Sequence, residues 1–185
     1  MPKTIEDLRK SILVEANKVV TEQGLDQLNM RVIAKACGVA VGTLYNYFPT
    51  KEALLSELMY NYWLEFLERV QKISREEKTF YDKLKDIYEQ LENMTTTFHE
   101  TWIKMSKKKG NMSEKDYAQK RDIVVYLIQI IEDLLLIHQM KNGHSFDPPM
   151  TPREFSSFIV QNFLSMGQMK QFKYETFDFI IRKIV

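Results

Sequence analysis

The sequence predicts an all-α protein. Of its 185 residues, 44% are hydrophobic and 28% are charged, a balance typical of soluble globular chains. Only 6 Gly and 5 Pro interrupt it, and no segment shows strand-like alternation followed by an Asn-Gly or Asp-Gly hairpin turn. Apolar residues instead recur at spacings of three and four along most of the chain, as they do on the buried face of a helix.

The composition also limits the class of function. With a net charge of +1, any nucleic-acid binding must come from a local patch of the surface. Cys37 is the only cysteine, which excludes an internal disulfide or a cysteine-based zinc site within one chain and suits a reducing compartment. We expect no run of about 18 apolar residues and no signal peptide, and hence a soluble, cytoplasmic protein without membrane contact.

The first helix is expected to begin at Thr4, which together with Asp7 resembles a capping box, and to end at Gly24. Apolar residues at spacings of three and four give it one buried face. The basic residues near its start either contact phosphate or belong to a solvated face. These residues are Lys3, Arg9 and Lys10.

Two short helices with a tight turn between them follow. Asn29 is a good N-cap for a helix that starts at about Met30, and Gly38 ends that helix after about two turns. Cys37 is expected to be a buried, unreactive thiol, because free cysteines are usually buried. Val39 is expected to pack the turn into the core.

The next helix, from about Val41 to Phe48, has an unusual outer face. Leu44 and Phe48 are four residues apart and form the inner face. The outer face has no charge. It combines a glycine, which permits close approach to DNA, short hydrogen-bonding side chains, which suit base edges, and phenols, which can donate to phosphates. We therefore predict a DNA-reading face made of Gly42, Thr43, Tyr45, Asn46 and Tyr47.

A break separates this helix from the following one. Pro49 forces Phe48 out of the helical region, and Thr50 can cap a new helix that opens at Lys51. At that position Lys51 either contacts a DNA phosphate beside the free amides of the helix start or is simply solvated.

The segment from Ile33 to Leu55 resembles the signature of the TetR family of bacterial transcription regulators. The likeness rests on Cys-Gly-Val-Ala-Val-Gly-Thr-Leu-Tyr-Asn-Tyr-Phe-Pro-Thr-Lys-Glu in register, and it extends from about Ile5 to Leu55. It implies a three-helix DNA-binding domain at residues 1–50 and a helical ligand-binding and dimerisation domain at residues 51–185. It further implies a homodimeric repressor that leaves its operator when a small apolar or amphipathic molecule binds.

By the same resemblance, the DNA-reading face meets the operator, and Asn29 and Lys51 contact phosphates. Family members usually have Ser or Thr where this chain has Ala40, and the Lys or Arg often found at the position of Val41 is absent. Ala40 cannot cap the recognition helix with its side chain, which removes about 1 kcal/mol of stabilisation.

Apolar periodicity predicts five further helices, at residues 51–74, 80 to about 107, 117–140, from about 153, and 174–184. The lysine run at residues 107–109 is either a nucleic-acid patch or a solvated helix end. On the most apolar helix, residues 117–140, four polar residues either lie on an exposed edge or line a cavity. They are Gln129, Glu132, Asp133 and His138.

Large apolar residues of this helical body either line an effector pocket or fill the core. The pocket candidates are Trp63, Phe66, Phe98, Trp102, Met105 and Tyr126. The last two helices carry more apolar residues than a small body covers easily, so they form either a homodimer interface, as the resemblance implies, or an intrachain core.

Two other functions compete with DNA binding, the first being that of an enzyme. The histidines His99, His138 and His144 lack the paired spacing of a metal site, and the chain has no Gly-rich phosphate loop and no nucleophile motif. We therefore predict no enzymatic activity, no metal and no cofactor. The second rival is a helical protein-interaction module in which the helix-turn-helix is only architectural.

Overall fold

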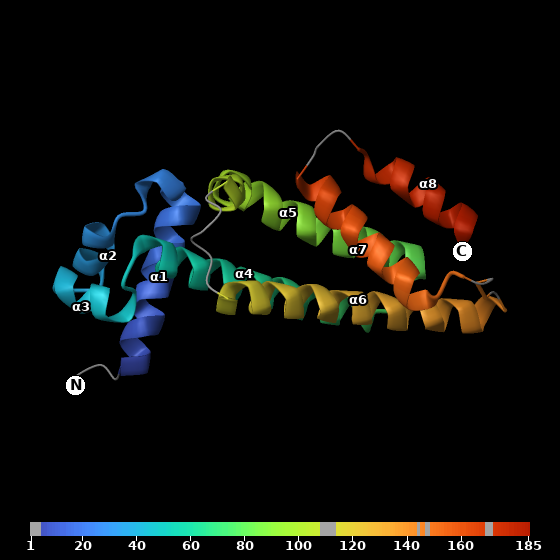
Figure 1. Cartoon of the computed structure of the whole chain (residues 1–185), viewed down its shortest axis with the longest axis horizontal. Helices are drawn as coiled ribbons and strands as arrows, with labels where there is room; N and C mark the ends of the chain where they lie inside the picture. Colours follow the sequence, from blue (N-terminus) through green and yellow to red (C-terminus); the bar gives the residue numbers. More distant parts are fainter. Residues whose placement is uncertain (1–4, 108–113, 144, 147–148, 169–171) are drawn as a thin grey trace. The chain divides into compact units, whose positions relative to one another are not determined.

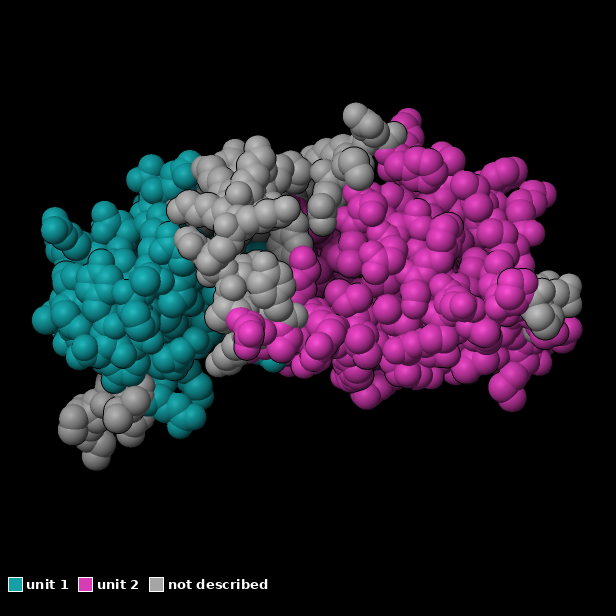
Figure 2. Space-filling model, in the orientation of Figure 1, with its two compact units in different colours: residues 1–62, 100–112 teal, residues 63–99, 113–185 magenta. Residues whose placement is uncertain are grey.

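The computed structural model describes residues 5–107, 114–143, 145–146, 149–168 and 172–185; side chains at 5, 25, 96–107, 115–117 and 168 lie outside this description. The described residues form helices joined by turns, without a β-strand among them, which confirms the predicted all-α class (Figure 1). They divide into two compact units, coloured teal and magenta in Figure 2. The domain boundary expected after residue 50 stays a prediction.

Unit 1 comprises residues 1–62 and 100–112. It contains α1 (Ile5–Gln23), the short 3₁₀ turn η1 (Leu25–Gln27), α2 (Met30–Ala36), α3 (Val41–Tyr47) and the first half of α4 (Lys51–Ser74). Helix α1 ends where Gly24 adopts a φ of 87°, a left-handed conformation that favours glycine. The fully buried core residues of this unit include Ile12, Ala16, Ile33, Ala34, Leu44 and Leu54.

Two expectations for the turn after α2 are wrong. Cys37 and Val39 are only half-buried, because the residues of α2 that face the core are Ile33 and Ala34. Cys37 instead lies at the edge of an open surface hollow between α1 and α2. The other residues that line this hollow are Lys10, Ser11, Val14, Glu15 and Ala36.

Unit 2 comprises residues 63–99 and 113–185. It contains the second half of α4, most of α5 (Phe80–Lys107), and α6 (Glu114–Asn142), α7 (Pro152–Gln168) and α8 (Tyr174–Ile184). Helices α6 and α7 pack side by side (Figure 1). Helix α7 approaches α5 closely at Gly167, where an added Cβ would lie 3.2 Å from Oγ1 of Thr95. Part of the lysine run at residues 107–109 and the expected cap at Thr4 lie outside the described residues.

Helix α6 contains a long apolar segment. Among the described residues, Ala118–Asn142 is the segment that is long and apolar enough to cross a membrane by length and composition. The sequence contains no uninterrupted run of about 18 apolar residues here, because Gln129, Glu132 and Asp133 interrupt it. The segment instead qualifies through its mean hydropathy of 1.6. Of the apolar window, 44% is buried inside the protein, and the core helix of a soluble protein passes the same test.

Two of the four polar residues of α6, Gln129 and Asp133, are exposed, as in the first of the two predicted outcomes, whereas Glu132 and His138 are half-buried. Gln129 donates to Asp133 over 3.0 Å, and Arg153 of α7 donates to Gln129 over 3.0 Å and to Glu132 over 2.8 Å. The ring of His138 stacks on Phe80, with 5.1 Å between the ring centroids. These groups therefore have partners within unit 2.

Candidate nucleic-acid interface

The ends of α2 are determined by local hydrogen bonds. Oδ1 of Asn29 accepts a hydrogen bond of 2.9 Å from the amide of Arg31, which confirms Asn29 as the N-cap. At the other end Gly38 has a φ of 69°, its amide donates to the carbonyl of Lys35, and the amide of Val39 donates to that of Ala34. This is the Schellman pattern, which closes a helix and reverses the chain over a few residues. The turn thereby leads directly into α3.

Helix α3 presents the face that the sequence predicts. Leu44 is 0% exposed and Phe48 is 1% exposed, so both are core residues. Gly42, Tyr45 and Asn46 are exposed, and Thr43 and Tyr47 are half-buried on the flanks of the helix. Since Asn46 is two residues from each of the two core residues, it points about 160° away from both. Asn46 therefore lies at the centre of the outer face.

Gly42 is not required by the fold of unit 1. Its φ is not positive, and a Cβ added there would meet no atom within 4 Å. Neither backbone conformation nor packing within unit 1 therefore requires a glycine at position 42. A residue without a side chain at an exposed site leaves the helix backbone accessible to an external partner.

The start of α3 lacks a side-chain cap, as predicted. Ala40 is the N-cap residue and forms no side-chain hydrogen bond, while its carbonyl accepts from the amides of Thr43 and Leu44 over 3.0 and 3.3 Å. The helix ends at Phe48, which is extended, with φ −133° and ψ 93°, because Pro49 follows. Thr50 then caps α4, its hydroxyl accepting from the amide of Ala53 over 3.0 Å. Lys51, half-buried, is the first residue of α4.

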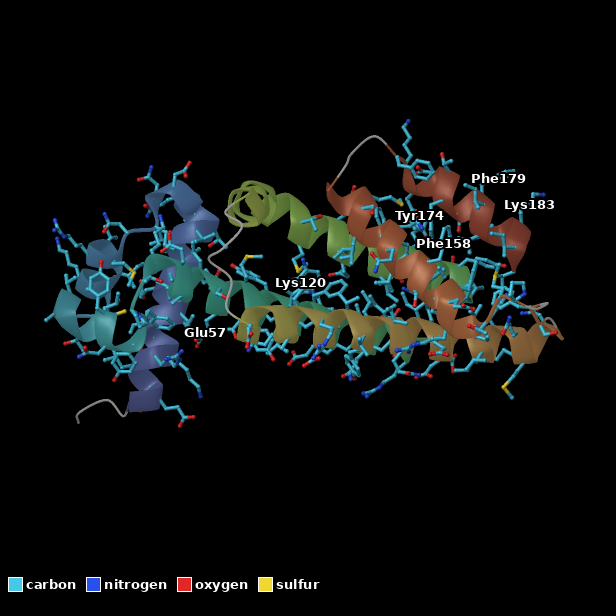
Figure 3. The ribbon with its side chains drawn as sticks, viewed as in Figure 1. Glu57, Lys120, Phe158, Tyr174, Phe179 and Lys183 are labelled. Atoms are coloured by element: carbon cyan, nitrogen blue, oxygen red, sulfur yellow. The ribbon has the colours of Figure 1, made fainter. Side chains whose placement is uncertain are left out.

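Arg9 holds three elements of unit 1 together. From α1 it forms a two-pronged ion pair with Glu57 of α4 (labelled in Figure 3), in which Nε donates to Oε1 over 2.8 Å and Nη2 donates to Oε2. Nη1 donates to the carbonyl of Tyr47 at the end of α3, and the guanidinium lies 4.6 Å from the ring centre of Phe48. The hydrogen bond with Glu57 raises the pKa of Arg9, against the opposing effect of burial.

The sequence suggested that Arg9 either contacts phosphate or belongs to a solvated face. Neither prediction included its ion pair with Glu57. Sequence reasoning could not find the pair, because Arg9 and Glu57 are 48 positions apart. Lys10 is exposed, and Lys3 lies outside the described residues.

Two basic residues of α2 were also missed. Arg31 and Lys35 are exposed, and they are four residues apart, on the same side of the helix. The signal was present in the sequence, since residues 28–51 contain Arg31, Lys35 and Lys51 but no acidic residue. This segment is the local positive patch that a chain of net charge +1 needs for contact with a polyanion.

Three pocket candidates fall within the described side chains. Trp63 is 7% exposed and Phe66 is 0% exposed, and their rings meet edge to face with 5.6 Å between centroids. Tyr126 is 41% exposed, and its hydroxyl accepts a hydrogen bond from Gln71. The side chains of Phe98, Trp102 and Met105 lie outside the described residues. Within the described part of the chain, no group of three or more His, Cys, Asp or Glu residues could hold a metal ion.

The last two helices expose large apolar side chains. Phe158 of α7 is 47% exposed, and Phe179 and Ile180 of α8 are 63% and 40% exposed. Figure 3 labels Phe158 and Phe179, together with Lys183, whose ammonium lies 5.5 Å from the ring centre of Phe179. The opposite side of α8 is buried through Phe177 and Ile181. Intrachain packing therefore covers only one side of this helix.

Comparison with known proteins places the N-terminal segment in a family. Residues 12–58 match the description "Bacterial regulatory proteins, tetR family". The chain is similar to the fatty acid metabolism regulator protein of Bacillus subtilis, with 38% identity over 73 residues, 40% of this chain and 38% of that one. It is also similar to an HTH-type transcriptional regulator of Haemophilus influenzae, with 29% identity over 85 residues, 46% of each chain. These matches span less than half the length of either relative.

Solved structures share the fold over most of the chain. The fatty acid degradation regulator FadR of Bacillus halodurans matches with a TM-score of 0.60 and 22% identity, over 87% of this chain and 82% of that one. FadR of Bacillus subtilis, in complex with stearoyl-CoA, matches with a TM-score of 0.59 and 23% identity, over 86% and 84% of the two chains.

Proposed function

This chain belongs to the tetR family of bacterial regulatory proteins, and from that premise we propose that it is a DNA-binding transcriptional repressor. The observation that carries the proposal is the outer face of α3, which is free of charge and has Asn46 at its centre. A solvated helix with no partner more often carries Lys and Glu. Short polar side chains on such a face suit the edges of bases in a major groove.

Each residue of the interface has a proposed role. Thr43 and Asn46 read base edges, Tyr45 and Tyr47 donate to phosphates, and Gly42 permits close approach of the backbone. The surrounding phosphates are contacted by Asn29, Arg31, Lys35 and Lys51, at the helix ends and along α2. Arg9 is a positioning residue, because it holds the last carbonyl of α3.

The functional form is proposed to be a homodimer formed through α7 and α8. Two recognition helices must reach major grooves about 34 Å apart, one turn of the duplex, which a dimer achieves. The exposed Phe158, Phe179 and Ile180 supply apolar surface for such an interface. Burying a large apolar side chain contributes about 1.5–3 kcal/mol.

A small apolar or amphipathic effector is proposed to release the protein from DNA. Its binding residues in unit 2 would be among Trp63, Phe66 and Tyr126. The similarity to a regulator solved with stearoyl-CoA supports an amphipathic molecule. Such a ligand acts by binding one conformation of the dimer more tightly than the conformation that fits the operator. We place the protein in the cytoplasm, where its operator would be.

A gel-shift titration with the DNA upstream of its own gene tests the proposal. The purified chain is expected to shift this DNA at low salt. Thr43→Ala combined with Asn46→Ala should remove the preference for this DNA over unrelated DNA. Lys51→Ala should weaken both equally and reduce the salt slope by about one. Lys141→Ala, a change at the exposed end of α6, is the control and should alter neither.

One outcome would refute the proposal. If the protein is a dimer by light scattering and still binds no DNA at low salt, the helix-turn-helix is architectural. The chain would then be a helical interaction module.

A further inference from the structure

Helix α3 lacks the side chains that read G·C pairs. Val41–Tyr47 contains no Arg or Lys, the residues that bind guanine O6 and N7, and no Asp or Glu, which accept from cytosine N4. The cations of this region, Arg31, Lys35 and Lys51, belong to α2 and α4. Direct readout by α3 must therefore use other chemistry.

Asn46 supplies one such readout. It is exposed at the centre of the outer face, opposite the buried Leu44 and Phe48, so a groove that receives α3 meets this side chain first. The side-chain amide of asparagine combines an NH₂ group, which can donate to N7 of adenine, with a carbonyl oxygen, which can accept from N6 of the same base. Asn46 is exposed, and a Cβ added at the nearby Gly42 would meet no atom within 4 Å, so packing within unit 1 does not account for either residue.

Thr43 supplies the second readout. It lies three residues before Asn46, about 4.5 Å along the helix axis, close to the base-pair spacing of about 3.4 Å. The two side chains therefore reach neighbouring base pairs. The methyl group of threonine contacts the thymine methyl, which only an A·T pair presents in the major groove. The bare backbone at Gly42 lets α3 come close enough for both short side chains to reach the bases.

We infer that each operator half-site is centred on adjacent A·T pairs, with an adenine opposite Asn46 and a thymine methyl beside Thr43. The inference rests on the proposed DNA binding and adds the bases that are read. Arg31, Lys35 and Lys51 contact the backbone on either side and contribute affinity without sequence preference.

Selection from a library of random duplexes, at fixed salt and with the full chain, tests the inference. Enriched sequences are expected to share two adjacent A·T pairs in each half-site. Asn46→Arg should exchange the adenine for a guanine, because arginine binds O6 and N7. Each such pair discriminates by about 5- to 150-fold. Lys35→Ala is the matched control, and it should weaken binding to all sequences while leaving the selected bases unchanged.

The thymine methyl has a separate test. Replacing the selected thymine by deoxyuracil removes only that methyl group and is expected to weaken binding about fourfold. Thr43→Ser keeps the hydroxyl but removes the methyl on the protein side, so this variant should bind the thymine and uracil duplexes equally. Circular dichroism melts verify that each variant folds.

Failure of the A·T readout and failure of the proposed DNA binding give different results. Strong enrichment of half-sites centred on G·C pairs, or an unchanged base preference in Asn46→Arg, would overturn the A·T readout while DNA binding stands. Absence of any enrichment by a dimeric, folded chain would overturn the proposed function itself.

Discussion

Breaking the ion pair between Arg9 and Glu57 is expected to destabilise unit 1 more than its surface position suggests. The two prongs join α1 to α4, and the same guanidinium donates to the carbonyl of Tyr47 and lies over the ring of Phe48. Arg9→Met keeps the aliphatic stem but removes all of these polar contacts. Glu57→Gln keeps the shape of the acceptor but removes its charge.

The magnitude follows from geometry and exposure. The side chains of Arg9 and Glu57 are 42% and 29% exposed, so solvent weakens the pair relative to a buried one. Exposed pairs contribute about 0.2–1 kcal/mol, and hydrogen bonds to charged groups about 1.5–3 kcal/mol. We expect an intermediate coupling of about 1–2 kcal/mol. The bond to Tyr47 and the contact with Phe48 add roughly 1 kcal/mol to the cost of Arg9→Met.

A double-mutant cycle measures this coupling. The free energy of unfolding is obtained from urea titrations followed by circular dichroism for the wild type, both single variants and the double variant. Amide exchange in α3 provides a local readout, and it should accelerate in Arg9→Met because the last carbonyl of the helix loses its donor. The control is Glu89→Gln, which breaks an exposed pair with Lys85 at 3.9 Å and should cost no more than about 0.5 kcal/mol.

A coupling no larger than the cost of the control would refute the reasoning. Arg9 and Glu57 would then be an ordinary surface pair. Unchanged amide exchange in α3 would separately refute the positioning role of Arg9.

Three further predictions concern single sites. Ala40→Ser supplies the missing cap of α3, so it should stabilise the protein by about 1 kcal/mol and slow amide exchange in α3. The control is Ala36→Ser at the last residue of α2, which should do neither, and equal effects of the two changes would mean that α3 needs no cap. Gly167→Ala should destabilise by roughly 1 kcal/mol through contact with Thr95, and adding Thr95→Ala should recover the loss because alanine then favours the helix; stabilisation by Gly167→Ala alone would contradict a tight approach. Burial raises the pKa of Tyr174, whose hydroxyl has no hydrogen-bond partner among the described residues. The stability that the neutral phenol contributes is therefore fully present below the pKa of tyrosine in the unfolded chain, about 10, and is lost as the pH rises above that value. Tyr174→Phe should be at least as stable at neutral pH and lose less stability above about pH 10, as thermal melts at several pH values can check; equal losses would contradict it.

Local sequence determined where most helices begin and end. Gly24 and Gly38 adopt the left-handed conformation that stops α1 and α2, and Pro49 and Thr50 separate α3 from α4 as predicted. These signals act through the backbone of residues within a few positions of one another. Helix ends can therefore be predicted from the sequence without the tertiary structure. Periodicity likewise identified the outer face of α3, because the buried Leu44 and its neighbours follow from 3.6 residues per turn.

The DNA-contact residues themselves remain predictions, since nothing in the fold requires them to bind. The sequence also contained a signal for the basic residues of α2. Residues 28–51 include Arg31 and Lys35 but no Asp or Glu, a pattern that predicts a local positive patch.

Only the tertiary structure decided which distant residues meet and which apolar faces are covered. It paired Arg9 with Glu57, left Cys37 half-buried, and exposed Phe158 and Ile180, although these two share the apolar periodicity of their helices. The physical reason is that periodicity assigns a side chain to one face of a helix, whereas burial and pairing depend on which other helix lies against that face. Short-range hydrogen bonds and dihedral preferences therefore set the elements, and long-range packing sets their partners.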